Sequence, residues 1–194
     1  SGLPACGKLT LAKTIHKDFN LKLLNQFDYY KEDYNVTTQL PDGTTLINWY
    51  TDNAIDWNKF NEDIETNKSK GVIVVGVSLP TDKIKVKPDY HIHLNMPKQL
   101  CMEKRNKYVE KHKDEHPEEY KILNTPAEKL KMNQLIYPYY LEAKRKSRIN
   151  KLLESSNVPL TDDEYKAIQL RSVIFFFIFL SCSIWFIMIH CCIM

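Results

Sequence analysis

The first ten residues of this chain hold the residue types and the spacing best suited to chemistry. Gly2, Gly7 and Lys8 are spaced as Gly, four residues, Gly-Lys, and an apolar-periodic segment follows them. This spacing predicts a loop that opens a helix. Glycines let backbone N–H groups turn toward one anion, while the helix N-terminus and the lysine supply positive charge. The sequence therefore predicts a phosphate-binding loop with these ligands: Gly2, Cys6, Gly7, Lys8, Leu9 and Thr10.

One position of this loop departs from the pattern. A Ser or Thr normally follows the lysine directly, and its hydroxyl contacts Mg²⁺. Leu9 stands there, and Thr10 comes one residue later. Thr10 is thus the candidate metal ligand, but only if the start of the helix shifts. An ordinary glycine turn with a solvated Lys8 is the alternative interpretation.

A second group of polar and aromatic residues extends from Gln26 to Asp33. It follows an apolar run at 21–24, which itself follows a predicted helix at 9–19, so we expect the start of a βαβ unit. Open α/β sheets place their binding sites at the carboxyl ends of strands. Asp28 and Tyr30 are therefore candidate site residues.

The rest of the chain must position these groups, and its pattern predicts a mixture of helices and strands. The continuous β-branched run at 72–77 is typical of a strand covered on both faces, so we place it centrally in the sheet. A second strand is expected at 90–94, where we interpret His91 and His93 as structural. We predict helices at 53–64, 97–112, 125–135 and 143–153, a charged, mobile connection at 113–124 and an interruption at 137–141.

Composition narrows the classes of partner and compartment. The chain has 27 Lys and Arg against 24 Asp and Glu, a balance that argues against nucleic acid as a partner. Five cysteines without paired spacing fit a reducing, cytoplasmic compartment. A phosphate loop normally follows a buried strand, and none precedes Gly2. We therefore expect that the first strand is missing and that the sequence is truncated at its N-terminus.

The composition changes abruptly near the C-terminus. Residues 173–189 carry no charge, and the whole segment 173–194 would extend about 33 Å as a helix, enough to cross a bilayer. We therefore divide the chain into a domain at 1–170 and a hydrophobic segment at 171–194. The prediction is a cytoplasmic body tail-anchored in an intracellular membrane. A buried core helix and an artefact of the gene model remain as alternatives.

Several motifs occur together in a fixed order. They are Gly-x-x-x-x-Gly-Lys-x-Thr-Leu-Ala-Lys at 2–13, Gln-x-x-Tyr-Tyr-Lys at 26–31, and Asn-Trp-x-x-x-x-Ala-Ile-Asp-Trp at 48–57. An apolar strand at 72–76, a basic helix with Lys104-Arg105 and Tyr-Pro-Tyr-Tyr-Leu at 137–141 follow. The set resembles the uridine kinase and nicotinamide riboside kinase group of phosphate-loop kinases over residues 2–165.

This resemblance implies a fold, a reaction and a set of site residues. The fold would be a three-layer α/β domain with a mostly parallel central sheet. The reaction would transfer the γ-phosphoryl group of ATP, with Mg²⁺, to the 5′-hydroxyl of a nucleoside such as nicotinamide riboside or uridine. Lys8 would neutralise charge, Arg105 would cover the phosphates from a lid, Asp28 would act as a displaced base, and Asp28, Tyr30 and Asp56 would contact the substrate.

The departures from the family pattern fall where its chemistry should be. Phe27 replaces the catalytic aspartate, Tyr50 replaces an aspartate that holds the ribose, and Val75 replaces an acidic residue that orders Mg²⁺. With Leu9, these substitutions make Mg²⁺ binding doubtful, although positioning and charge compensation dominate phosphoryl transfer.

The departures leave simpler interpretations open for three residues. Asp28 and Phe27 would face opposite ways on an extended segment, Asp56 could be ordinary helix surface, and Arg105 a solvated basic side chain. A catalytically impaired pseudokinase that binds a nucleotide or a partner while tethered to a membrane is the alternative function, and a decayed gene is a weaker one.

Overall fold

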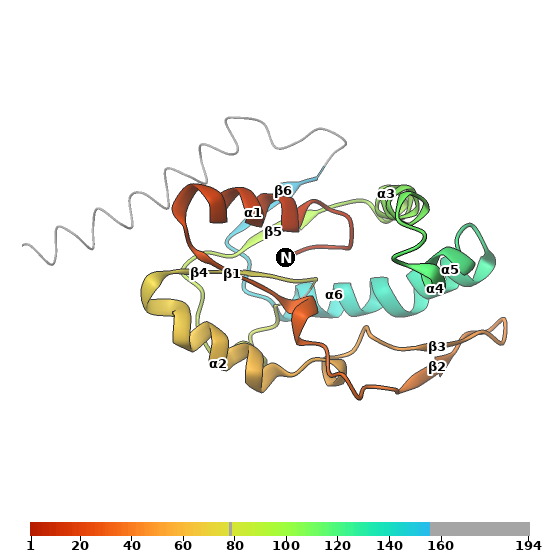
Figure 1. Ribbon diagram of the computed structural model, residues 1–194, viewed down its shortest axis with the longest axis horizontal. Coiled ribbons are helices and arrows are strands. Elements are labelled where there is room, and N and C mark those ends of the chain that lie inside the picture. Colours follow the sequence, from red (N-terminus) through yellow and green to blue (C-terminus); the bar gives the residue numbers. More distant parts are fainter. Residues whose placement is uncertain (78, 156–194) are drawn as a thin grey trace, which may run out of the picture. The chain divides into compact units, whose positions relative to one another are not determined.

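The fold was examined in a computed structural model that describes residues 1–77 and 79–155 (Figure 1). The hydrophobic segment predicted at 171–194 lies outside these residues. Within the described part, no helix is long and apolar enough to cross a membrane. The compact unit Ser1–Glu154 is mixed α/β, and two of its three small strand pairs are parallel, so the predicted fold class is confirmed at that level.

The N-terminal half forms a βαβ unit, as the sequence predicts. Helix α1 (Lys8–Phe19) leads into strand β1 (Lys22–Asn25), which pairs in parallel with β4 (Val72–Val75). Helix α2 (Trp57–Asn67) connects them, and Figure 1 shows α1 and α2 on opposite sides of the pair. Asp56 caps α2, so this helix begins later than predicted, after a 3-10 turn η2 at Asp52–Ala54.

The core of this half lies between α2 and the strands. It consists of Leu24, Tyr29, Ile55, Phe60 and Ile64, all at most 7% exposed. Tyr29 and Phe60 have ring centroids 4.6 Å apart, and the Tyr29 hydroxyl donates to Asp63 Oδ2 at 2.6 Å. Burial of these side chains fixes the end of β1, from which the residues at 26–31 emerge.

A second parallel pair joins β5 (Ile92–Asn95) to β6 (Lys151–Glu154). The N-terminus runs beside β5, since Gly2 forms an isolated parallel bridge to Leu94 and Leu94 N donates to Ser1 O at 2.9 Å. Among the described residues, β4 pairs only with β1, so its predicted central position is not seen. The remaining strands, β2 (Thr37–Gln39) and β3 (Thr45–Ile47), form an antiparallel hairpin.

Helices form the remaining part of the unit. Helix α3 (Lys98–Lys111) is confirmed, and the expected mobile connection contains a short helix α4 (Pro117–Lys121). Helix α5 (Pro126–Lys131), a π-helical turn η4 (Met132–Ile136) and α6 (Tyr137–Lys146) follow without a break. The predicted interruption at 137–141 is thus wrong. Pro138 lacks the N–H that an α-helix needs, and it is accommodated directly after the wider π turn.

The prediction of a helix up to residue 153 is also wrong at its end, because residues 151–154 form strand β6. The backbone becomes extended at Ser147, whose Oγ donates to Ala143 O at 2.7 Å and to Leu79 O at 3.0 Å. Basic composition fits a helix and an exposed strand equally well. Here pairing with β5 decides the structure, with Leu153 buried and its neighbours exposed.

Candidate anion-binding site

The loop at 2–7 adopts the backbone conformation that its glycines suggest. Gly2, Ala5 and Gly7 all have positive φ, at 152°, 59° and 88°. A Cβ on Gly2 would lie 2.6 Å from Leu94 O and 2.7 Å from Cys6 Sγ, so only glycine fits there. At Gly7 a Cβ would meet nothing within 4 Å, and the left-handed backbone alone favours glycine.

Helix α1 begins immediately after this loop. Its N-cap is Gly7, which offers no side-chain acceptor, and its first turn contains no acidic residue. The first N–H groups of a helix have no partner within the helix and carry partial positive charge. They are therefore available to water or to an anion at the concave side of the loop.

Lys8 lies at the centre of this arrangement. Its side chain is buried, with 9% of the residue exposed, and its Nζ donates to Leu3 O at 3.0 Å. None of the ion pairs in the described part of the chain includes Lys8. Burial lowers the pKa of this ammonium group, although the thiols of Cys6 and Cys101 act in the opposite direction. A buried cation without a carboxylate is costly, and a bound anion would remove that cost.

Phe27 and Asp28 lie in the 3-10 turn η1 (Gln26–Tyr29), not on an extended segment. The Phe27 ring is half-exposed, and its centroid is 5.7 Å from Lys8 Nζ. Asp28 is exposed, and no ion pair among the described residues joins it to the lysine. The structure thus brings Phe27, the residue in the place of the expected base, to Lys8.

Aromatic side chains continue from Phe27 to the neighbouring segment. Ring centroids are 5.8 Å apart for Phe27 and Tyr30, 5.3 Å for Tyr30 and Trp49, and 5.4 Å for Trp49 and Tyr34. Burial raises the pKa of Tyr30, with Tyr50 and Tyr139 contributing in the same direction, so its hydroxyl stays neutral. The predicted substrate residue Tyr30 therefore belongs to an aromatic wall that reaches Lys8 through Phe27.

Two other residues of the predicted site form hydrogen bonds that belong to the fold. Asp56 caps α2, because its Oδ1 accepts from Lys59 N at 3.1 Å, and its own N–H donates to Tyr29 O at 2.8 Å. Thr10 is exposed in the first turn of α1, and its carbonyl accepts from Thr14 Oγ1 at 3.1 Å. Helix α1 starts at Lys8, so the shift that would bring Thr10 into the place of Leu9 is not seen.

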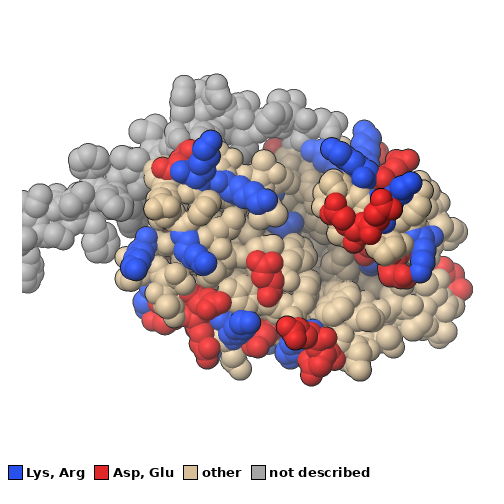
Figure 2. Space-filling model, viewed as in Figure 1, with Lys and Arg blue, Asp and Glu red and all other residues tan. Residues whose placement is uncertain are grey.

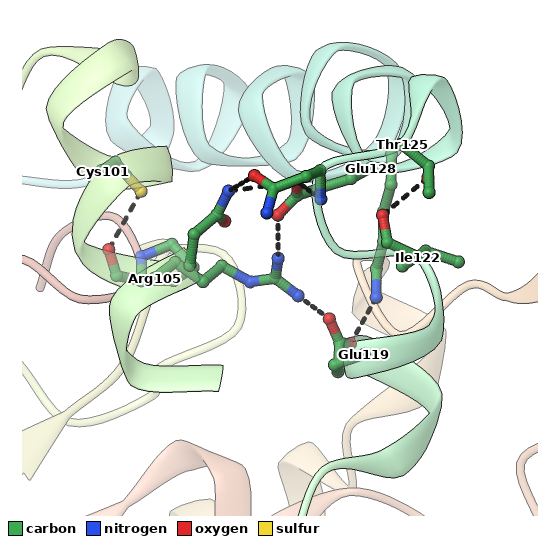
Figure 3. A network of polar contacts seen from close by, with 10 residues as sticks. Cys101, Arg105, Glu119, Ile122, Thr125 and Glu128 are labelled. Atoms are coloured by element: carbon green, nitrogen blue, oxygen red, sulfur yellow. Dashed lines mark hydrogen bonds and ion pairs between the residues drawn. The ribbon is translucent and has the colours of Figure 1, made fainter. Parts of the chain in front are cut away.

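Arg105 lies on α3, and its guanidinium group forms ion pairs with two carboxylates (Figure 3). It contacts Glu119 of α4, and its Nη1 lies 3.3 Å from Glu128 Oε1 of α5. Glu119 also pairs with Lys131. One turn before Arg105, Cys101 Sγ donates to Pro4 O at 3.0 Å, which joins α3 to the loop. Burial raises the pKa of Cys101 to about 11, so the thiol keeps its proton.

The molecular surface is hollowed between the side that carries α1 and α2 and the side that carries α3, α4 and α5 (Figure 2). Cys101 and Pro4 join the two sides through α3 and the loop. The Lys8 loop, the aromatic wall and Arg105 come from elements on both sides.

The donor set of the loop does not fit a protein-bound Mg²⁺ ion. Leu9 is exposed in the first turn of α1, and Val75 at the end of β4 is buried at 3% exposure. No group of three or more His, Cys, Asp or Glu in the described part of the chain could hold a metal. Magnesium prefers oxygen ligands, which neither side chain offers. His91 and His93 instead bond to Ser1 Oγ at 2.7 and 3.0 Å, as expected of structural histidines.

Sequence reasoning missed the two connections made by α3. Nothing in the spacing links Cys101 to Pro4 or brings Glu119 to Arg105. Thr125-x-x-Glu128 matches the capping-box pattern, but Thr125 caps α5 without a side-chain hydrogen bond, and Glu128 Oε2 accepts instead from Asn124 N at 2.9 Å. In comparisons with known proteins, no family model and no curated protein matches this chain.

Proposed function

We propose that this chain binds the phosphates of a nucleoside triphosphate, with ATP as the expected ligand, at the loop from Gly2 to Thr10. The observation that carries the proposal is the buried ammonium group of Lys8, which has no carboxylate partner among the residues that the structure describes and lies at the uncapped start of α1. A phosphate group supplies the missing negative charge and accepts from the N–H groups of the first turn. Leu9 would contribute its backbone N–H group, whereas the N–H of Cys6, which the sequence also predicted as a ligand, donates to Leu3 O at 3.3 Å.

The reaction that we propose is transfer of the γ-phosphoryl group to the 5′-hydroxyl of a nucleoside such as uridine or nicotinamide riboside. Lys8 would neutralise charge on the phosphates, and the aromatic wall with Tyr30 would hold the acceptor. Asp28 is the carboxylate next to Phe27 and would take the proton of the hydroxyl. Because the donor set does not fit Mg²⁺, no step is assigned to a metal. The resemblance of the ordered motifs supports this reaction class.

A coupled assay with ATP and either uridine or nicotinamide riboside tests the transfer. We expect turnover that is lost in Lys8→Ala and reduced in Asp28→Asn, while Asp33→Asn on the following segment serves as the matched control. Turnover that survives Lys8→Ala would exclude this site as the catalytic centre. Loss in Lys8→Ala with full activity in Asp28→Asn would assign the base elsewhere.

A second candidate is a pseudokinase that binds a nucleotide without turnover. It is favoured by three placements: Phe27 beside Lys8, Leu9 at the second residue of α1, and Val75 buried at the end of β4. In that case ATP raises the melting temperature equally in Mg²⁺ and in EDTA, and no phosphorylated nucleoside forms. A thermal shift that requires Mg²⁺ would count against this candidate.

Membrane attachment through 173–194 is proposed from the composition of that segment alone. Fractionation of cells that express the full chain and a chain ending at 170 tests it. We expect the full chain with the membranes and the shorter chain in the supernatant. An equal distribution of the full and the shorter chain between membranes and supernatant would contradict a tail anchor.

A further inference from the structure

Arg105 belongs to a small cluster of ionised side chains, here called the arginine cluster, that joins α3, α4 and α5. Its members are Arg105, Glu119, Glu128 and Lys131. The Arg105 side chain is 11% exposed, so its charge is largely shielded from water. Two positive and two negative groups balance each other. In this arrangement the guanidinium group is neutralised without any ligand.

The same face of α3 also contacts the phosphate loop. Cys101 lies one helical turn before Arg105 and donates to Pro4 O at 3.0 Å. Residues four apart on a helix are neighbours on its surface. The backbone of Arg105 therefore lies one helical turn from Cys101, the residue that contacts the loop. Figure 3 nevertheless shows the Arg105 side chain extending away from Cys101 toward Glu119. The charge of Arg105 still lowers the pKa of both Cys101 and Tyr50, which opposes the effect of their burial.

The two carboxylates that hold Arg105 differ in how firmly they are fixed. Glu128 is 4% exposed and also accepts from Asn106 Nδ2 at 3.1 Å and from Asn124 N at 2.9 Å. Glu119 is 29% exposed, and within the described residues its ion pairs are those with Arg105 and Lys131. Glu119 on the short helix α4 is thus the partner from which Arg105 separates more easily.

We propose that Glu119 is a positioning residue that holds Arg105 away from the phosphate loop, and that a bound triphosphate takes this arginine from it. The inference rests on the proposed function, since it requires a triphosphate at the loop. A guanidinium group binds phosphate and carboxylate with the same two-pronged geometry, so the two anions compete for one arginine. The carboxylate therefore lowers the affinity of the chain for the triphosphate.

Isothermal titration of ATP into the full chain tests the competition. Glu119→Gln removes the competing charge and is expected to tighten ATP binding by about three- to tenfold. This is part of the affinity that one charge-assisted hydrogen bond contributes, since Glu128 still holds the arginine. Glu118→Gln is the matched control on the same helix, because within residues 1–77 and 79–155 the ion pair of Glu118 is with the exposed Lys121. We expect that control to leave the affinity unchanged.

The same substitution in an Arg105→Ala variant distinguishes competition for the arginine from a general loosening of the helices. In Arg105→Ala, the further change Glu119→Gln is expected to have no effect on ATP affinity, because the arginine to be released is absent. If Glu119→Gln fails to fold, Glu119→Asp keeps the charge but shortens its reach, and we expect a smaller gain in affinity. A merely structural role for Glu119 would weaken binding in both backgrounds.

The outcomes distinguish this inference from the proposed function. The inference is overturned if ATP binds in a Lys8-dependent manner while Glu119→Gln leaves its affinity unchanged or weaker, or if the gain persists in Arg105→Ala. If the unaltered chain does not bind ATP, or if Lys8→Met leaves binding intact, the proposed function fails and the inference falls with it.

Discussion

At the scale of single residues, the decisive group is the Lys8 side chain. A buried ammonium with a lowered pKa stabilises the folded state less than an apolar side chain of the same size would. Its Nζ donates to the carbonyl of Leu3 and lies over the ring of Phe27, and none of the ion pairs within the described residues includes it. The Lys8 ammonium group is therefore costly to the fold, which is what the proposed phosphate site would require.

This interpretation predicts an unusual effect of mutation. Lys8→Met keeps the apolar stem and removes the charge, so we expect the free energy of unfolding to rise or stay level, by roughly 0–2 kcal/mol. Lys13→Met, at an exposed position of the same helix, is the control and should be neutral. Urea denaturation measures both. A clear loss of stability in Lys8→Met would mean that the ammonium group is already satisfied.

The buried histidines give a prediction for pH. Burial lowers the pKa of His91 to about 4 and that of His93 to about 3, against about 6.5 when unfolded. The unfolded chain therefore binds more protons below pH 6.5, and stability falls as the pH drops from 6.5 toward 4.

Replacing one of these histidines should flatten that dependence. In His93→Gln we expect the slope of unfolding free energy between pH 4.5 and 6.5 to decrease by up to about one bound proton. His16→Gln, on the exposed face of α1, is the control. An identical slope in wild type and His93→Gln would show that His93 is protonated in the folded state too.

At the scale of elements, Gln26 connects the ends of β1 and β4. Its Oε1 accepts from Val77 N at 3.1 Å, and a Cβ on Gly76 would lie 2.5 Å from this oxygen and 2.9 Å from Gln26 Cβ. The contact holds the carboxyl ends of the two strands together, beside the turn that presents Phe27 and Tyr30.

We expect Gly76→Ala to destabilise the fold by about 1–3 kcal/mol through overpacking. The cost should shrink when Gln26→Ala is also present, because the side chain that the new methyl group meets is then shorter. Thermal unfolding of the two single variants and the double variant measures this coupling. Additive effects would show that Gly76 matters for backbone conformation and not for space.

Prediction from sequence worked for elements whose pattern is local. The sequence predicts helix α1 and strand β4 correctly because apolar pattern and glycine spacing are properties of neighbouring residues, and it predicts helix α3 as a basic helix. The interruption expected at 137–141 failed because a π-helical turn accommodates Pro138, and β6 was missed because its identity depends on pairing with a strand some sixty residues away. Local pattern carries no information about such pairing.

The candidate site also contains some residues that local pattern predicts and others that depend on distant contacts. The loop and Lys8 follow from spacing, whereas the positions of Phe27, Asp56 and Arg105 depend on packing between distant elements. Asp28 was expected opposite to Phe27 on an extended segment, but the 3-10 turn at 26–29 changes the direction of both side chains. The contact between Cys101 and Pro4 spans 97 residues and has no signature in the sequence.

At the scale of the whole described unit, two groups of elements meet at the phosphate loop. The βαβ unit of α1, β1, α2 and β4 supplies Lys8 and the aromatic wall, and α3 brings Arg105 with its carboxylates. The Cys101–Pro4 contact joins them, so a ligand at the loop is in a position to affect α3. The proposed nucleotide binding would place the phosphates at this loop, where Leu9 and Val75 offer no oxygen ligand to a metal.

The most direct test of this account is the affinity of the purified full chain for ATP, measured by isothermal titration for wild type, Lys8→Met and Lys13→Met. We predict that wild type and Lys13→Met bind ATP alike and that Lys8→Met binds at least about tenfold more weakly, because it loses a charge-assisted contact to phosphate. Equal binding by all three, or no binding by wild type, would contradict the assignment of the loop as a phosphate site.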